Sequence, residues 1–357
     1  MKIGILTYHR AHNYGAVLQC YALQETLKKL GADVHIIDYK QPHIDWVYKP
    51  KYSIKHIIKL ILTVRLNSLY NYLHLIKKLF NRKKNFESFR NKYLNCTEEC
   101  KDNIPQDFDR FVIGSDQVWG IHCTKTFDKT FWGDFKRKPS SKLYGYAVSS
   151  NGDYHQFLSN QELYFYINLF DNITFREEKI QKDIEVSTGI NKGISLDPTL
   201  LTDEIIWKPL LNNKWNKNEY VVVYQIRRLH DWPTMLESKA QQYAEKYKSK
   251  VVNLSGMYYP IEDFISLIKN AQCVFTSSFH ATVFSIIFGT PFYSFLLYDG
   301  HDERYQSLLQ KLKLSKHLVD KNSETNITPY ISNIDETKKI LTQLKAESLN
   351  YLKEIVH

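Results

Sequence analysis

The stretch from Lys2 to Asp38, KIGILTYHRAHNYGAVLQCYALQETLKKLGADVHIID, decides the fold. Its first seven residues are mostly apolar and predict a buried strand, and a polar turn follows at 9–15. Apolar residues then recur at the helical period over 16–30, and Gly31 is placed to end that helix. The next apolar run, 33–38, predicts a second strand. Two strands joined by a helix in one sheet run parallel, so the chain opens with an α/β unit.

The same order of elements recurs further along the chain. Two more strands of the first half are predicted at Phe108–Gly114 and Lys142–Val148. In the second half the sequence predicts strands at Tyr220–Ile226, Lys250–Leu254, Cys273–Thr276 and Pro291–Leu297, with helices between them.

We therefore expect an α/β fold of two doubly wound, Rossmann-like domains that face a cleft. The expected domains are residues 1–212 and 213–330. The last stretch, 331–357, has apolar residues at helical spacing and is expected to pack as a helix against the N-terminal domain.

The positive charge of the chain is concentrated in one block. The 357 residues carry a formal net charge of +10, but residues 49–92 alone contain twelve basic residues and one acidic residue, which makes +11. This block belongs to a predicted amphipathic helical insertion of about residues 49–95. Its lysines either form a solvated face or attract anionic lipid head groups. We expect no nucleic-acid partner, since no RNA-binding motif accompanies the charge.

The five cysteines have no regular spacing, which argues against a disulfide framework and for a reducing compartment. Cys96 and Cys100 have no second pair, so we expect no metal site. No signal peptide follows Met1, and no apolar stretch approaches the roughly 20 residues of a membrane-spanning helix. The expected location is the cytoplasm, at the inner face of the cell membrane if the basic block binds lipid.

Polar residues follow the predicted strands, at the sheet edge where open parallel sheets bind ligands. Asn13, Tyr14 and Gly15 open the first helix, whose N-terminus favours an anion, and simple capping by Asn13 is an equal alternative. Asp116 and Gln117 follow the strand that ends at Gly114. The glycine patterns of dinucleotide sites and P-loops do not occur.

The segment TSSFH, residues 276–280, lies between a predicted strand and a predicted helix. Ser277, Ser278 and His280 therefore gather at a helix N-terminus, which suits a phosphate or carboxylate. His280 can also exchange a proton near neutral pH, although a purely structural role is the commoner one for a single histidine.

Several arginines also follow predicted strands, and a guanidinium group matches phosphate or carboxylate with two parallel hydrogen bonds. Each alone is a typical surface charge, but together they could face one cleft. These arginines are Arg176, Arg227, Arg228 and Arg304.

Several motifs, taken in order, resemble those of the polysaccharide pyruvyl transferase family. They are GILTYHRAHNYGAVLQCYALQETLKKLG, FVIGSDQVWG, the pair YAVSSNG and LDPTLL, and SSFHATVFSIIFGTPF. The resemblance covers about residues 1–310 apart from the basic insertion. It implies a GT-B-like fold and transfer of the pyruvyl group of phosphoenolpyruvate onto two sugar hydroxyls, with release of phosphate and with no cofactor.

The resemblance also implies roles for the candidate residues. His280 is similar to the donor-site histidine of the family, and Arg176 to a donor-site arginine. We expect the donor anions to be bound by Arg176, Arg227, Arg228, Ser277, Ser278 and Arg304, and the acceptor side of the cleft to be lined by Asn13, Tyr14, Gly15, Asp116 and Gln117.

One departure separates the chain from better-characterised members of the family, which often carry arginine two positions before this histidine. Ser278 stands there instead. Either another arginine supplies the charge, or the donor or the reaction has changed.

The expected partners are phosphoenolpyruvate and a glycan or lipid-linked oligosaccharide of a surface polysaccharide. Two other functions stay open. One is a glycosyltransferase of the same architecture that uses a nucleotide sugar. The other is a non-catalytic glycan-binding relative, for which Ser278 is the main support.

Overall fold

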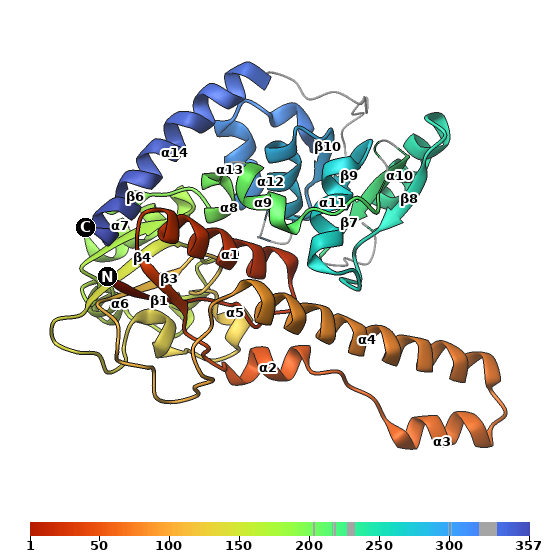
Figure 1. Cartoon of the computed structure of the whole chain (residues 1–357), viewed down its shortest axis with the longest axis horizontal. Helices are drawn as coiled ribbons and strands as arrows, with labels where there is room; N and C mark the ends of the chain where they lie inside the picture. The colour runs from red at the N-terminus through yellow and green to blue at the C-terminus, as the bar shows by residue number, and fades with distance from the viewer. Residues whose placement is uncertain are drawn as a thin grey trace.

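The computed structural model describes the chain except residues 203, 216, 218, 227–232, 299, 301 and 321–333. It consists of two parallel β-sheets, each covered by helices, with a long helical arm that projects from the body (Figure 1). The expected pair of Rossmann-like domains is therefore confirmed.

The first sheet has the strand order β2-β1-β3-β4-β5-β6. Its strands are β1 (Lys2–Leu6), β2 (Asp33–Ile36), β3 (Arg110–Gly114), β4 (Lys142–Val148), β5 (Asn172–Phe175) and β6 (Gly193–Ile194). The helices of this part are α1 (Tyr14–Lys29), α2 (Pro42–Tyr48), α3 (Ile54–Leu62), α4 (Leu66–Tyr93), α5 (Ile121–Thr124), α6 (Asn160–Ile167), α7 (Glu178–Thr188), α8 (Pro198–Leu201) and α9 (Glu204–Trp207).

The second sheet has the order β11-β10-β9-β7-β8. Its strands are β7 (Tyr220–Tyr224), β8 (Lys250–Asn253), β9 (Cys273–Thr276), β10 (Phe292–Phe295) and β11 (Leu318–Val319). The helices are α10 (Pro233–Lys246), α11 (Ile261–Asn270), α12 (Phe279–Phe288), α13 (Glu303–Lys311) and α14 (Ile334–Val356).

The element bounds differ from the sequence-based prediction at several places that concern the site, including the end of β7, which lies at Tyr224 rather than Ile226. β1 ends at Leu6 rather than Tyr8, because the chain turns there and the His9 N–H donates to the Thr7 carbonyl. Arg304, which follows the last predicted strand, lies in the first turn of α13, since Asp302 is the N-cap residue of that helix.

The two domains share one apolar core. Residues of both sheets, such as Val112 in β3 and Val222 in β7, belong to the same buried cluster. At the contact between the domains the Tyr14 ring stacks on Phe264 with ring centres 4.1 Å apart, and its hydroxyl donates to the Tyr259 carbonyl. Such burial fixes the facing surfaces of the two sheets relative to one another.

The C-terminal helix α14 returns from the second domain to the first (Figure 1). The Tyr351 hydroxyl donates to the Gly145 carbonyl in β4, and the Ser348 hydroxyl accepts from the Leu196 N–H. Leu352 and Ile355 are fully buried in the shared core.

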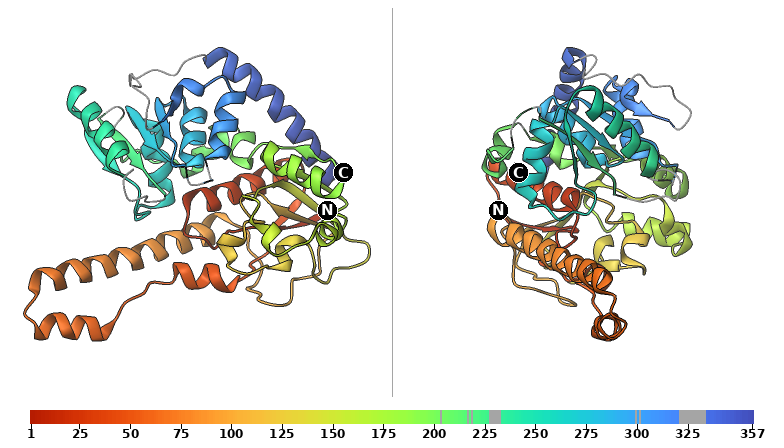
Figure 2. Two further views of the ribbon diagram at one scale, coloured as in Figure 1. Left: turned by 180° about the vertical axis from the view of Figure 1, so that it is seen from behind. Right: turned by 90° about the vertical axis from the view of Figure 1, so that its right-hand side faces the viewer.

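The basic insertion forms the arm, residues 49–93, in which α3 folds back beside α4 (Figure 2). Phe86 and Phe89 near the end of α4 are buried and anchor the arm to the body. Lys78 still lies over the Tyr258 ring of the second domain, and the outer end of the arm stands away from both domains in Figure 1 and in the left view of Figure 2. Among the described helices, none is both long and apolar enough to cross a membrane.

Candidate functional site

A cavity of about 400 Å³ lies between the two domains and collects residues from both. We call it the interdomain cavity. From the first domain it is lined by Tyr8, Asn13, His43, Ile44, Val47, Tyr48, Asp116, Gln117, His122 and Lys125, among others, and from the second by Ile226, Ser277, Phe279, His280 and Arg304.

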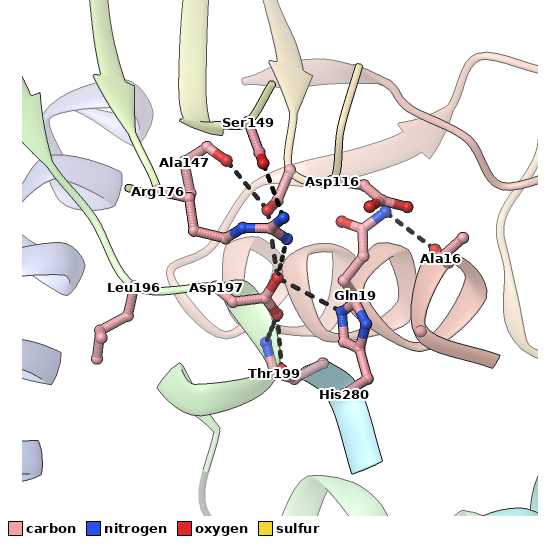
Figure 3. Close-up of polar contacts among 12 residues, drawn as sticks. Ala16, Gln19, Asp116, Ala147, Ser149, Arg176, Leu196, Asp197, Thr199 and His280 are labelled. Atoms are coloured by element: carbon pink, nitrogen blue, oxygen red, sulfur yellow. Dashed lines mark hydrogen bonds and ion pairs between the residues drawn. The ribbon is translucent and has the colours of Figure 1, made fainter. Parts of the chain in front are cut away.

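His280, the second residue of α12, is held at this cavity by both domains. It is buried, and its Nε2 lies 3.5 Å from the Oδ2 of Asp197, which is an ion-pair distance (Figure 3). The other ring nitrogen, Nδ1, lies against Gly15, where a Cβ atom would come within 1.9 Å of it. The glycine at the start of α1 therefore makes room for the histidine of the opposite domain.

Asp197 connects His280 to a buried ion-pair network (Figure 3). Its Oδ2 is 2.9 Å from the Nη1 of Arg176, and Thr199 donates to its Oδ1 through both the backbone N–H and the hydroxyl. Burial opposes ionisation of Asp197, but the adjacent His280 and Arg176 outweigh burial and hold the pKa of this carboxyl well below its usual range. Asp197 is therefore a fixed negative charge beside His280.

Arg176 lies in this network rather than in the interdomain cavity. Its Nε donates to Glu177 at 2.7 Å and its Nη2 to the Ser149 hydroxyl at 2.8 Å, so every edge of the guanidinium faces a protein acceptor. It lines a second cavity of about 270 Å³, which shares Phe279 and Arg304 with the first.

The structure brings six of the predicted site residues together in the interdomain cavity. They are Asn13, Asp116, Gln117, Ser277, His280 and Arg304. Asn13 also caps α1, as its side chain accepts from the Gly15 N–H. Asp116 has a φ of 72°, in the left-handed region that few non-glycine residues adopt.

The other predicted residues have different places. Tyr14 packs at the domain contact, and Gly15 supports His280. Ser278 caps α12, because its hydroxyl accepts from the Ala281 N–H, and it does not line the cavity. Arg227 and Arg228 fall outside the described residues.

Several buried polar atoms at the cavity have no hydrogen-bond partner in the described part of the protein. They include the Ser277 hydroxyl, and the Nε2 of Gln225, just after β7, is buried without a partner as well. Buried polar atoms are almost always satisfied, so these groups are suited to hydrogen bonds with a ligand.

Sequence reasoning used the LDPTLL motif only for the resemblance and did not single out Asp197. A signal was present, because this aspartate follows a short strand and precedes Pro198, the typical first residue of a helix. Its pairing with Arg176 and His280 is a tertiary contact, which no local pattern predicts. The described residues contain no group of three or more His, Cys, Asp or Glu side chains arranged to hold a metal ion.

Comparison with solved structures finds proteins that match nearly the whole chain at low sequence identity. A putative UDP-N-acetylglucosamine 2-epimerase from Listeria monocytogenes is 12% identical with a TM-score of 0.45, covering 99% of this chain and 90% of the other. The UDP-GlcNAc 2-epimerase from Methanocaldococcus jannaschii is 11% identical with a TM-score of 0.42, covering 97% and 100%. UGT89C1 of Arabidopsis thaliana, complexed with UDP, is 10% identical with a TM-score of 0.45, covering 100% and 99%.

Comparison with curated proteins finds no match. The sequence model of one family does match, and it covers residues 13–300, which is most of the chain and includes the whole interdomain cavity except Tyr8, Ala11 and Arg304. The chain therefore belongs to the polysaccharide pyruvyl transferase family.

Proposed function

We propose that this protein transfers the pyruvyl group of phosphoenolpyruvate onto two hydroxyls of a sugar in a surface glycan or its lipid-linked precursor, forming a ketal and releasing phosphate. The observation that carries the proposal is the interdomain cavity, in which His280 of one domain and Asp116 of the other line the same space. A cavity of about 400 Å³ is within the size range of small-ligand sites.

The donor would bind on the side of the second domain. Phosphoenolpyruvate carries about three negative charges, which need cations and oriented N–H groups. The N-terminus of α12, the unpartnered Ser277 hydroxyl and Arg304 supply them. In this proposal Arg304 takes over the charge that an arginine at the position of Ser278 would provide.

The reaction can be written in balanced steps. Protonation of the terminal enol carbon gives an oxocarbenium-like centre at the adjacent carbon, and one sugar hydroxyl adds there while a base takes its proton. The bond to the phosphate oxygen then breaks, and the phosphate leaves. The second hydroxyl adds to the same carbon and loses its proton, which closes the ketal.

His280 is suited to hold the proton in these steps. Asp197 stays ionised and faces Nε2, so it orients the ring. Nδ1, the nitrogen beside Gly15, is left to exchange a proton with substrate. Asp116 and Gln117 on the opposite wall are placed to bind the hydroxyls of the acceptor.

A lipid-linked acceptor would also give the arm a role as a peripheral membrane contact. Most exposed large apolar side chains of the described chain lie between Trp46 and Phe80, and Leu62 and Val64 at the turn between α3 and α4 are 76% and 74% exposed. Together with the charge of +11 over 49–92, this combination suits an anionic bilayer surface.

The test incubates purified protein with phosphoenolpyruvate and candidate nitrophenyl or lipid-linked glycosides and follows phosphate release, with the ketal identified by mass spectrometry. We expect glycan-dependent phosphate release that is lost in His280→Ala and kept in His357→Ala, which changes an exposed terminal histidine. Turnover of a nucleotide sugar without phosphoenolpyruvate would establish a glycosyltransferase instead. Glycan binding without any turnover would establish a non-catalytic relative.

A further inference from the structure

A separate cavity of about 340 Å³ lies at the root of the arm, and we call it the basic pocket. It is lined entirely by the first domain and the arm. Five cations, Arg10, Lys40, Lys49, Lys83 and Arg90, face it together with His12 and three carboxylates.

The carboxylates of the basic pocket neutralise only part of this charge. Arg10 is held by Asp38 at 2.7 and 2.8 Å and by Glu99 at 2.8 Å, and Lys40 shares Glu99. Lys83 lies 3.6 Å from Glu87 on the same helix. Arg90 and Lys49 have no carboxylate partner among the residues that the structure describes, so two cations remain available for a ligand.

His12 gives an independent sign of a missing ligand. It is only 7% exposed and lies between Tyr48 and Phe86, with ring-centre distances of 5.1 and 5.2 Å. Its Nδ1 is buried and has no hydrogen-bond partner in the described structure. Burial, together with the nearby charges of Arg82, Arg90 and Lys83, lowers the pKa of His12 to about 3.

The basic pocket therefore presents hydrogen-bond donors and positive charge that lack an acceptor. A buried polar atom without a partner is costly, and an oxyanion would satisfy the imidazole N–H and Arg90 together. Arg82 of α4, next to the pocket residue Lys83, also has a buried Nε without a partner in the described chain. Phosphate oxygens are the chemistry that arginine, lysine and a neutral histidine N–H recognise in common.

We propose that the basic pocket binds a phosphate or diphosphate group of the acceptor, the group through which a lipid-linked glycan is joined to its lipid. This inference rests on the proposed function for the identity of the acceptor. Tyr48 lines both the basic pocket and the interdomain cavity, so the two cavities are neighbours. In this proposal one acceptor molecule places its phosphate in the first and its sugar in the second. Lys49, Lys83, Glu87 and Arg90 of the arm line part of the pocket, so it adjoins the segment that the proposed function places at the membrane.

The first test measures binding of inorganic pyrophosphate to the full chain by titration calorimetry, with no turnover required. We expect saturable binding that Arg90→Ala and Lys49→Ala each weaken at least about tenfold, since a hydrogen bond to a charged group is worth that much. Lys84→Ala is the matched control, because Lys84 is an exposed cation of α4 outside the pocket. Lys49 is itself exposed, so its removal leaves the core intact.

The second test separates the acceptor phosphate from the donor phosphate. Lys49→Ala and Arg90→Ala should raise the KM for a diphosphate-linked glycolipid about tenfold and leave the KM values for a nitrophenyl glycoside and for phosphoenolpyruvate unchanged. A raised KM for phosphoenolpyruvate would assign the pocket to the donor and overturn the proposal. Absence of pyrophosphate binding, or equal binding by Arg90→Ala and the unmodified protein, would overturn it as well. Pyrophosphate binding without any pyruvyl transfer would overturn only the proposed function.

Discussion

At the residue scale, the contact between Gly15 and His280 ties the position of the histidine to the opposite domain. The glycine belongs to α1 and the histidine to α12, and the ring occupies the space where any larger residue would place its Cβ. Gly15 lies in the first turn of α1, so alanine suits its backbone, and the three atoms nearest to an added Cβ all belong to the ring.

We therefore expect Gly15→Ala to lower kcat/KM by about 100-fold, because a displacement of about 1 Å at a reacting group is enough for that loss. Steady-state kinetics and a circular dichroism spectrum check the effect and the fold. Gly193→Ala is the control, since its added Cβ would only reach ordinary contact distance from Thr174. Unchanged kinetics in Gly15→Ala would show that the ring position does not matter for turnover.

Asp197 is the second residue on which His280 depends. Asp197→Asn keeps the size of the side chain and removes the charge, so it leaves Arg176 with only one carboxylate and His280 with none. We expect activity to fall by about 100-fold or more and the free energy of unfolding by about 3–5 kcal/mol.

Denaturant titration and kinetics measure these two effects of Asp197→Asn. Glu177→Gln is the comparison, because it removes the other partner of Arg176 without touching His280. If both variants lost activity equally, the effect would come from the ion-pair network and not from the orientation of His280.

At the element scale, the arm is unusual because it exposes apolar and basic side chains together. α3 carries Ile58, Ile61 and Leu62, all at least 49% exposed, beside the exposed Lys55 and Lys59. A helix that packed only against α4 would bury its apolar side chains, so the exposed face is consistent with a lipid surface.

We expect the double variant Lys55→Glu with Lys59→Glu to weaken binding to vesicles that contain anionic lipid by at least about tenfold. Each basic residue near such a surface contributes about 1 kcal/mol, and reversal removes more than neutralisation. Vesicle flotation measures binding. Lys338→Glu with Lys339→Glu changes the same charge on the exposed side of α14 and should bind like the unmodified protein. Failure of the unmodified protein to bind anionic vesicles would identify the arm as a solvated face.

At the scale of the whole molecule, the shared core and α14 join the two domains. One buried cluster includes strands of both sheets, and α14 starts beside the second domain and ends buried against the first. Such continuity favours unfolding as one cooperative unit.

Calorimetry should therefore show a single unfolding transition, at the same temperature by tryptophan fluorescence and by far-ultraviolet circular dichroism. Trp119 and Trp132 lie in the first domain and Trp207 in the shared core, so the fluorescence reports on both regions. Two separated transitions would show that the domains unfold independently despite their contact.

The free energy of unfolding should also depend on pH. Burial alone would raise the pKa of Asp38, but its hydrogen bonds with His9 and Arg10 outweigh burial and hold this pKa well below its usual range. The pKa of Asp197 is likewise held well below its usual range. Their stabilising effect is complete above the ordinary aspartate pKa of about 4 and is lost as pH falls, since only the unfolded chain then binds protons. We expect the unfolding free energy to fall between about pH 5 and pH 2, and Asp38→Asn to be less stable at pH 7 with a smaller fall. Asp102→Asn, at an exposed loop position, should follow the unmodified protein.

The sequence alone determined the order and type of the elements that carry the site. The apolar pattern predicts β9 with the bounds that the structure has, because burial selects apolar residues along a strand. The sequence also predicted Asn13, Asp116, Ser277 and His280 as site residues, because each follows a predicted strand and a parallel sheet places the carboxyl ends of its strands at one edge.

Only the tertiary structure decided how those residues combine. Asp197 and Arg176 are 21 positions apart and His280 lies in the other domain, so their pairing depends on how the two sheets pack. The same packing separates Arg176 from the interdomain cavity. The residue pattern within a segment shows which side chains are buried and which backbone conformation the segment adopts. Contacts between segments depend on how the segments pack together, which no single segment encodes.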